Sequence, residues 1–221
     1  MENALIIGAS GGIGGALAAA LEARGVSVTA LSRSVDGFDV EQPDRADAML
    51  EQVTDRYDLI IVALGILAPP GQTPEKSLSA IDYSAMARVF AVNAVGPAIV
   101  ARHLPRLLQR DTRAVVAVLS ARVGSIGDNQ IGGWHSYRAS KAALNQIVRG
   151  AAIELKRTHP ETICVALHPG TVRTAFTENY AARHKTVAAT SAASDLMHVI
   201  DGLSPQQTGG FYDYSGDEVP W

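Results

Sequence analysis

The sequence has 221 residues, of which 47% are hydrophobic and 19% are charged; this suffices for one sizeable core but not for two ordinary enzyme domains, so we expect one domain over residues 1–221. Its 19 basic and 22 acidic side chains give a net charge of -3, and no stretch concentrates Lys and Arg, so nucleic acid is not an expected partner. The single cysteine, Cys164, excludes an internal disulfide and favours a reducing compartment. The first residues do not resemble a signal peptide, and no apolar run reaches the about 18 to 20 residues of a membrane span. We therefore expect a cytoplasmic protein outside any membrane.

The predicted elements alternate between strands and helices. In chain order we expect a strand at Ala4–Ile7, a glycine turn, a helix at Ala16–Ala23, strands at Val26–Leu31 and Phe38–Val40, a polar helix at about Pro43–Arg56, a strand at Leu59–Ala63, a long helix around Tyr83–Leu108 that Gly96-Pro97 could interrupt, a strand at Ala114–Leu119, a helix through Tyr137–Leu144, a strand at Ile163–Leu167 and a short strand near Phe211–Tyr214. This alternation favours βαβ crossovers. We therefore predict an α/β fold of the Rossmann type, a doubly wound parallel sheet with helices on both faces.

A glycine-rich turn follows the first predicted strand, with five glycines between Gly8 and Gly15. In this context a dinucleotide pyrophosphate lies on the N-terminus of the next helix. Gly8 would make the turn, Gly12 would let the backbone approach the phosphates, and Gly14 would let helix and strand pack closely. The alternatives are a turn that binds nothing or one that binds S-adenosylmethionine, as in a methyltransferase. We predict a cofactor site formed by Gly8, Ser10, Gly11, Gly12, Ile13 and Gly14.

Arg33 stands at the end of the second predicted strand, where an acidic side chain usually meets a free ribose hydroxyl. A guanidinium can pair with a 2′-phosphate and stack on adenine, so we expect NADP(H) to be preferred over NAD(H). The alternative is a solvated surface arginine. Asp39 and Val40, at the end of the Phe38–Val40 strand, are candidates to meet the adenine, although Asp39 could instead be an acid at the approach to a helix.

Tyr137 and Lys141 are four residues apart, which places a phenol and an ammonium on one face of a helix. A phenol has a pKa of about 10, and a neighbouring positive charge lowers that pKa toward neutral pH, where the group can act as an acid or base. The pair follows the Ala114–Leu119 strand, at the sheet edge where doubly wound folds bind ligands. The six histidines show no metal-binding spacing, so no metal site is expected.

These motifs resemble the short-chain dehydrogenase/reductase family along nearly the whole chain. Gly8–Gly14 is similar to the family's TGxxxGIG turn, with Ile7 in place of the leading Thr. Asn93, Ser120, Tyr137 and Lys141 match the family's Asn-Ser-Tyr-Lys tetrad in order, and HPGTVRT at 168–174 resembles the segment beside the nicotinamide. PEKSL at 74–78, GSIGDN at 124–129, GGW at 132–134 and the GGFYDYSGDEVPW ending resemble the small branch that includes the C-factor and sniffer-type carbonyl reductases.

The sequence departs from the family pattern in two places near the site. Val62-Ala63-Leu64-Gly65 stands where the family has Asn-Asn-Ala-Gly, so only Gly65 is retained. Ser120-Ala121 stands where the family usually has two serines, the second of them catalytic. Counting from the strand end selects Ser120, counting back from Gly124 selects Ala121, and Ser125 is a further candidate; we choose Ser120 because Ala121 has no hydroxyl.

The resemblance implies an NADP(H)-dependent oxidoreductase, a carbonyl reductase or alcohol dehydrogenase, that transfers hydride between nicotinamide C4 and a small carbonyl or alcohol substrate. Ser120 would hydrogen-bond the substrate oxygen, Tyr137 would be the general acid or base, Lys141 would lower the pKa of Tyr137 and bind the nicotinamide ribose, and Asn93 would hold a water. Gly65, Pro169, Gly170, Val172 and Thr174 would line the cofactor site, with Thr174 at the carboxamide.

Two further expectations follow from the same resemblance. Family members commonly associate through the helices that contain Asn93 and Tyr137, so a homodimer or homotetramer is expected. The changes at Ala63 and Ala121 leave open an alternative from another class, a catalytically weak or inactive NADP(H)-binding regulatory or signalling protein of the same fold.

Overall fold

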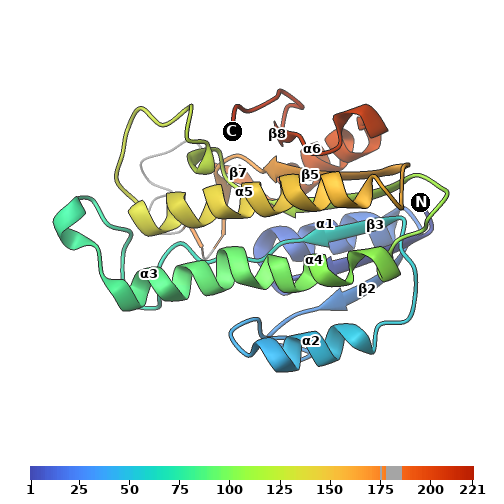
Figure 1. Ribbon diagram of the computed structural model, residues 1–221, viewed down its shortest axis with the longest axis horizontal. Helices are drawn as coiled ribbons and strands as arrows, with labels where there is room; N and C mark the ends of the chain where they lie inside the picture. The colour runs from blue at the N-terminus through green and yellow to red at the C-terminus, as the bar shows by residue number, and fades with distance from the viewer. Residues whose placement is uncertain (175, 178–185) are drawn as a thin grey trace.

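The described part of the chain, residues 1–174, 176–177 and 186–221 of a computed structural model, contains a six-stranded parallel sheet with helices on both faces (Figure 1). The strands pair in the order β2-β1-β3-β4-β5-β8. Their bounds are β1 (Asn3–Ile7), β2 (Ser27–Leu31), β3 (Leu59–Val62), β4 (Ala114–Leu119), β5 (Thr162–His168) and β8 (Phe211–Asp213). A separate short parallel pair is formed by β6 (Val172–Arg173) and β7 (Val187–Ala188). The predicted doubly wound α/β fold is confirmed.

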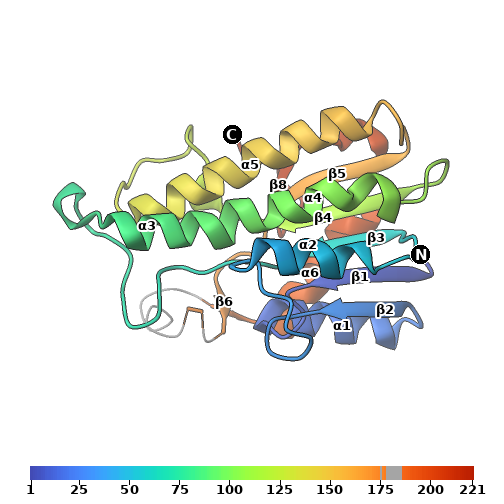
Figure 2. The ribbon, with the colours of Figure 1, turned by 60° about the horizontal axis from the view of Figure 1, so that its bottom comes forward.

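The helices divide between the two faces of this sheet (Figure 2). They are α1 (Gly12–Ala23), α2 (Pro43–Glu51), α3 (Tyr83–Phe90), α4 (Gly96–Leu107), α5 (His135–Leu155) and α6 (Ala189–Gly202), with a π-helical stretch η2 (Ala91–Val95) and 3-10 turns η1 (Leu78–Ala80), η3 (Arg122–Gly124) and η5 (Pro205–Gln207). Helices α2, α4 and α5 cover one face, and α1 and α6 cover the other.

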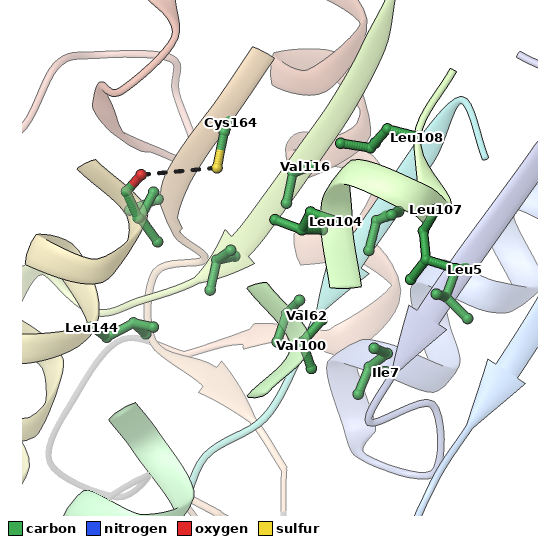
Figure 3. Packing of buried hydrophobic residues seen from close by; sticks show 14 of the residues in the cluster. Leu5, Ile7, Val62, Val100, Leu104, Leu107, Leu108, Val116, Leu144 and Cys164 are labelled. Carbon is green, nitrogen blue, oxygen red and sulfur yellow. Dashed lines mark hydrogen bonds between the residues drawn. The ribbon is translucent and has the colours of Figure 1, made fainter. Parts of the chain in front are cut away.

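Alternate side chains of each strand point to opposite faces of the sheet and so belong to two separate hydrophobic clusters. In β1, Leu5 and Ile7 belong to the cluster under α4 and α5, whereas Ala4 and Ile6 belong to the cluster under α1 and α6. Because successive side chains of a strand point to opposite faces, a strand that is covered on both sides must be apolar throughout. Figure 3 shows the first cluster, in which Leu104 of α4 packs among strand residues and the buried Cys164 thiol lies 3.9 Å from the Val148 carbonyl oxygen.

Two of the predicted elements differ from the structure. Phe38–Val40 is not a strand: the Ser32 carbonyl accepts hydrogen bonds from the main-chain N–H groups of Asp36 and Phe38, both at 3.1 Å, and so closes a turn after β2. Phe38 and Val40 are nevertheless buried, which explains their apolar character. The polar helix ends at Glu51 and not near Arg56.

Gly96-Pro97 does not break the long helix. The chain continues from α3 through the π-helical η2 into α4, and Pro97, which has no N–H to donate, stands in the first turn of α4 directly after the π-helical stretch. This segment, Tyr83–Leu107, is the one described helix long and apolar enough by composition to cross a membrane, but 44% of its most apolar window is buried in the protein. It packs on the sheet as a core helix does.

The carboxyl ends of the parallel strands meet at one edge of the sheet, on the left in Figure 1. Strand β1 lies between β2 and β3, so the strand order reverses there and a crevice opens between the loops that follow β1 and β3. The loops after β4 and β5 end at the same edge.

Candidate active site

The loop after β1 has the geometry of a phosphate-binding turn. Gly8 has a φ of 93°, and a methyl group added to it would lie 2.6 Å from the Ala63 carbonyl oxygen. A methyl group on Gly14 would collide with the Gly8 carbonyl oxygen. Helix α1 starts at Gly12, and no side chain caps it, so its first N–H groups are available to an anionic ligand. The backbone therefore has the shape that the sequence predicts.

A cleft of about 520 Å³ opens at this turn. Of the predicted site residues, those lining it are Ser10, Gly11, Gly12, Ile13, Gly14, Gly65, Ser120, Tyr137, Lys141, Pro169, Gly170, Val172 and Thr174. Thr174 closes over the glycine turn, since a methyl group on Gly12 would lie 2.5 Å from its Cγ2 atom. Segments far apart in the sequence are thus brought together around one cavity.

Tyr137 and Lys141 form one wall of the cleft from the first turns of α5. Both are buried, with 7% and 3% of their surfaces exposed. The Lys141 ammonium donates a 2.9 Å hydrogen bond to the Leu119 carbonyl oxygen, and burial lowers the pKa of Lys141 to about 7. Burial raises the pKa of Tyr137 above its ordinary value. The expected lowering of the Tyr137 pKa is therefore absent here, because removal from water disfavours the phenolate.

Ser120 lies at the end of β4 and is buried. Its hydroxyl donates a 2.6 Å hydrogen bond to Oδ1 of Asn145, one turn beyond Lys141 on α5. Ser125 is also buried, but its hydroxyl accepts the Asp128 N–H at 3.0 Å within its own loop. Of the two hydroxyls weighed for the catalytic position, Ser120 is the one that lines the cleft.

Asn93 is fully buried in the π-helical η2. Its Oδ1 atom accepts the Ile66 N–H at 2.7 Å, and its Nδ2 atom donates to the Ile66 carbonyl at 2.9 Å and to the Ser140 hydroxyl at 3.0 Å. A methyl group on Gly65 would lie 3.5 Å from both Asn93 Oδ1 and Lys141 Nζ. Asn93 thus fixes the loop after β3 against the helix that carries Lys141.

The residues predicted to meet the adenosine lie beyond the cleft. Arg33 has 69% of its side chain exposed and lies 3.9 Å from Glu41, which Arg88 binds through two hydrogen bonds of 2.7 and 3.0 Å. Asp39 accepts the Glu41 N–H at 3.0 Å just before α2. Val40 is buried and packs against Gly96. Asp39 therefore makes the contacts expected of an acid that precedes a helix, which was the alternative to a contact with the adenine.

The sequence reasoning missed three contributors to the site. Asn145 is one, and the signal was its place one turn after Lys141 on the same helix face. The ring of Phe176 is a second, because it lies edge-on to Tyr137 with centroids 6.0 Å apart, as does the ring of Trp134 at 6.2 Å; Trp134 was already a candidate from the sequence, as a residue at the substrate mouth or a cap of its loop. His168 is the third: it lines the cleft, and burial lowers its pKa to about 4 against the opposing charge of Asp213.

No group of three or more His, Cys, Asp and Glu side chains among the described residues could hold a metal ion.

Comparison with known proteins gives a family for this site. The model of the short chain dehydrogenase family matches residues 35–185. The C-signal protein of Myxococcus xanthus is 42% identical over 66% of this chain and 84% of its own length, which supports the branch that the motifs predict. A 1-hydroxy-2-glutathionyl-2-methyl-3-butene dehydrogenase of Rhodococcus is 28% identical over the full length of both chains, 100% of each.

Solved structures agree with this assignment. A carbonyl reductase from Pseudomonas aeruginosa in complex with NADP is 30% identical and superposes over 100% of both chains with a TM-score of 0.77. The Sniffer carbonyl reductase of Drosophila melanogaster, 22% identical, has the same fold with a TM-score of 0.79 over 100% of both chains. The family match, covering more than half of the chain, and these relatives show that the protein belongs to the short-chain dehydrogenase family of oxidoreductases.

Proposed function

We propose that the protein is an NADP(H)-dependent carbonyl reductase or alcohol dehydrogenase in which Tyr137 is the general acid or base. The observation that carries the proposal is that Tyr137, Lys141 and Ser120 line the same cleft as the glycine turn at the start of α1. A proton donor and a phosphate-binding turn around one cavity are the two parts that nicotinamide-dependent carbonyl reduction needs from a protein.

The residues of the cleft fit a dinucleotide. Gly12 and Gly14 line the cleft, and added methyl groups on Gly8 and Gly14 would meet backbone within 2.6 Å; a tight glycine turn of this kind lets backbone approach a pyrophosphate. Bound there, the nicotinamide would supply or accept the hydride. The N–H groups at the start of α1 would hold the phosphates, and Thr174 and the Pro169-Gly170 segment would hold the nicotinamide end. The NADP-bound relatives support NADP(H) as the cofactor.

The chain's own side chains would manage the proton. The buried Tyr137 hydroxyl, which burial keeps protonated, would give its proton to the substrate oxygen during reduction. Lys141, already desolvated and bound to the Leu119 carbonyl, would stabilise the phenolate that results and contact the ribose hydroxyls. Ser120 would orient the substrate oxygen once its hydroxyl turns from Asn145 toward the cleft.

The test is NADPH oxidation with a panel of aldehydes and ketones. Tyr137→Phe should lower the rate with any responsive carbonyl by about 100-fold or more, since it removes a general acid, and should leave NADPH binding intact. Tyr83→Phe is the matched control, because Tyr83 is 87% exposed. A Tyr137→Phe protein that reduces carbonyls at the parent rate would refute the assignment.

The second candidate is an NADP(H)-binding regulatory or signalling protein with little or no turnover. It is supported by the donation of the Ser120 hydroxyl to Asn145, by Ala63 in place of the family's asparagine, and by the similarity to a protein named C-signal. NADPH binding without oxidation across the whole panel would favour this candidate, and turnover of any carbonyl would argue against it.

The remaining proposals concern the surroundings of the enzyme. A homodimer or homotetramer would use the exposed faces of η2, α4 and α5, and a mass of about 23 kDa in solution, the mass of one chain, would contradict it. We also propose one domain over residues 1–221, a cytoplasmic location and a small carbonyl or alcohol as the partner.

A further inference from the structure

The start of α5 is held by a residue that comes 61 positions earlier in the chain. The Glu75 carboxylate accepts the Ser136 main-chain N–H at 3.2 Å and also accepts a hydrogen bond from the Ser136 hydroxyl. The Glu75 main-chain carbonyl accepts the Trp134 N–H at 2.5 Å. In Figure 1 the teal loop that contains Glu75 and the first yellow turn of α5 lie at the same end of the molecule. Glu75 therefore binds the residues on both sides of His135, where the helix begins.

Helix α5 needs this help because its own N-cap is poor. Trp134 occupies the N-cap position with φ 51° and ψ 43°, and its side chain makes no capping hydrogen bond. Gly132, Gly133 and Trp134 all have positive φ values, 69°, 64° and 51°, and the left-handed region is unfavourable for a bulky side chain. A helix end of this kind leaves N–H groups without partners. Glu75 supplies both a capping acceptor and a negative charge at the positive end of the helix dipole.

The Glu75 carboxyl is suited to this role. Partial burial acts to raise its pKa, but hydrogen bonds from Ser136 and its own loop outweigh burial and hold the pKa below the ordinary value. The group is thus an anion at neutral pH, and a charged acceptor makes the stronger hydrogen bonds.

Tyr137 follows Ser136 directly, and its ring lies edge-on to that of Trp134. Two of the neighbours of the phenol, Ser136 and Trp134, are therefore bound to Glu75. The same loop is fixed at its other end, where Asn93 binds the N–H and carbonyl groups of Ile66. The segment from Ile66 to Glu75 thus connects the cofactor side of the cleft to the helix that carries Tyr137.

We propose that Glu75 is a positioning residue for Tyr137: by holding the left-handed entry and first turn of α5, it fixes the phenol in the cleft. This inference rests on the proposed function for its kinetic consequence, although the contact itself does not. It also gives a role to the PEKSL segment, which the catalytic tetrad does not explain.

The test compares Glu75→Ala and Glu75→Gln with Glu161→Ala, an exposed glutamate on a turn far along the chain. With NADPH and a responsive aldehyde or ketone, Glu75→Ala should lower kcat by about 10-fold or more, because a displaced reacting group loses rate steeply. The Kd for NADPH, measured by fluorescence, should stay within about 2-fold of the parent value, because the contact lies away from the glycine turn. Glu75→Gln keeps one oxygen acceptor without the charge and should recover part of kcat.

Hydrogen exchange provides the readout that needs no turnover. In Glu75→Ala, amides in the first turn of α5 should exchange faster than in the parent and in Glu161→Ala, while amides of β4 should not. An unchanged exchange rate at residues 134–138, or a kcat equal to that of Glu161→Ala, would overturn the proposal. If exchange accelerates as expected but the parent oxidises no NADPH with any carbonyl, the proposed function fails while the positioning of Tyr137 by Glu75 stands.

Discussion

The hydroxyl of Ser120 donates a 2.6 Å hydrogen bond to Oδ1 of Asn145, and the Asn145 amide nitrogen lies 3.5 Å from the Gly124 carbonyl oxygen. One buried side chain on α5 thereby joins the end of β4 to the turn that follows it. Only 4% of Ser120 and 3% of Asn145 is exposed, so the hydrogen bond lies almost entirely away from bulk water.

Replacement of Asn145 should therefore destabilise the protein. Asn145→Ala leaves the Ser120 hydroxyl and the Gly124 carbonyl without this partner, and should lower the free energy of unfolding by about 1–3 kcal/mol. Urea unfolding measures it, with the exposed neighbour Gln146→Ala as the control. Equal stabilities of the two variants would show that the hydrogen bond contributes nothing.

Burial of Lys141 predicts a pH dependence of stability. Its pKa falls from 10.5 to about 7 on folding, so between these values the unfolded chain binds a proton that the folded chain does not. The free energy of unfolding should therefore rise from pH 7 upward. Burial of Cys164, which raises its pKa from 9.0 to about 12, acts in the opposite direction above about pH 9, so the measurement belongs between pH 7 and 9.

Urea unfolding at several pH values within this window should give a steeper rise for the parent than for Lys141→Met. The exposed Lys156→Met provides the control, and its curve should parallel that of the parent. If the Lys141→Met curve is also parallel, the ammonium is not desolvated as the structure indicates.

The glycine turn predicts two different outcomes for two alanine substitutions. Gly14→Ala places a methyl group against the Gly8 carbonyl, which is backbone, whereas Gly12→Ala meets the side chain of Thr174, at its Cγ2 and Cβ atoms. Gly14→Ala should lower the free energy of unfolding by about 1–3 kcal/mol. Gly12→Ala should fold nearly as well as the parent but bind NADPH at least about 10-fold more weakly, because its methyl group occupies the cleft.

Thermal unfolding and fluorescence titration with NADPH distinguish the two effects. Gly202→Ala, at a position with open space around it, should change neither. NADPH binding by Gly12→Ala at the parent affinity would place the pyrophosphate elsewhere.

Arg33 and Glu41 predict the cofactor preference. Arg33→Ala should weaken NADPH about 10-fold or more and NADH little, because a 2′-phosphate needs a cation. Glu41→Gln should tighten NADPH by a few-fold, since it removes the carboxylate 3.9 Å from Arg33. Binding titrations of both cofactors at low salt provide the measurement, with the exposed Arg157→Ala as the control. Equal losses for NADPH and NADH in Arg33→Ala would remove the basis for preferring NADP.

The sequence predicted well the features that depend on neighbouring residues. The apolar run at Ala114–Leu119 is β4 residue for residue, because a strand buried on both faces has no polar alternatives. The glycine turn was readable in part for the same reason, since Gly11, Gly14 and Gly15 each meet backbone atoms of the turn itself. Phe38–Val40 was wrong because burial alone does not make a strand: its N–H and carbonyl groups also need a partner strand, and β2 is the edge of the sheet.

The parts of the site that depend on distant contacts were not predicted. The expected effect of Lys141 on Tyr137 considered charge and spacing, whereas in the structure burial raises the pKa of the phenol. No sequence motif points to a role for Asn145 or Glu75, because each acts on a residue that only the fold brings near it. The assignment of Ser120 and the roles of the tetrad stay predictions until turnover is measured.

The anchoring of the β3–α3 connection at Ile66 and at Glu75 has a practical consequence for engineering. Between these two points, the stretch at 70–73 is exposed, and Gly71 has open space around it. Insertions in an exposed loop disturb the rest of a protein little when the loop is fixed at both ends. Each doubling of the loop length lowers the free energy of unfolding by only about 0.6 kcal/mol. An affinity tag or a fluorescent reporter inserted after Gly71 would accordingly lie on the surface and leave the contacts at Ile66 and Glu75 in place.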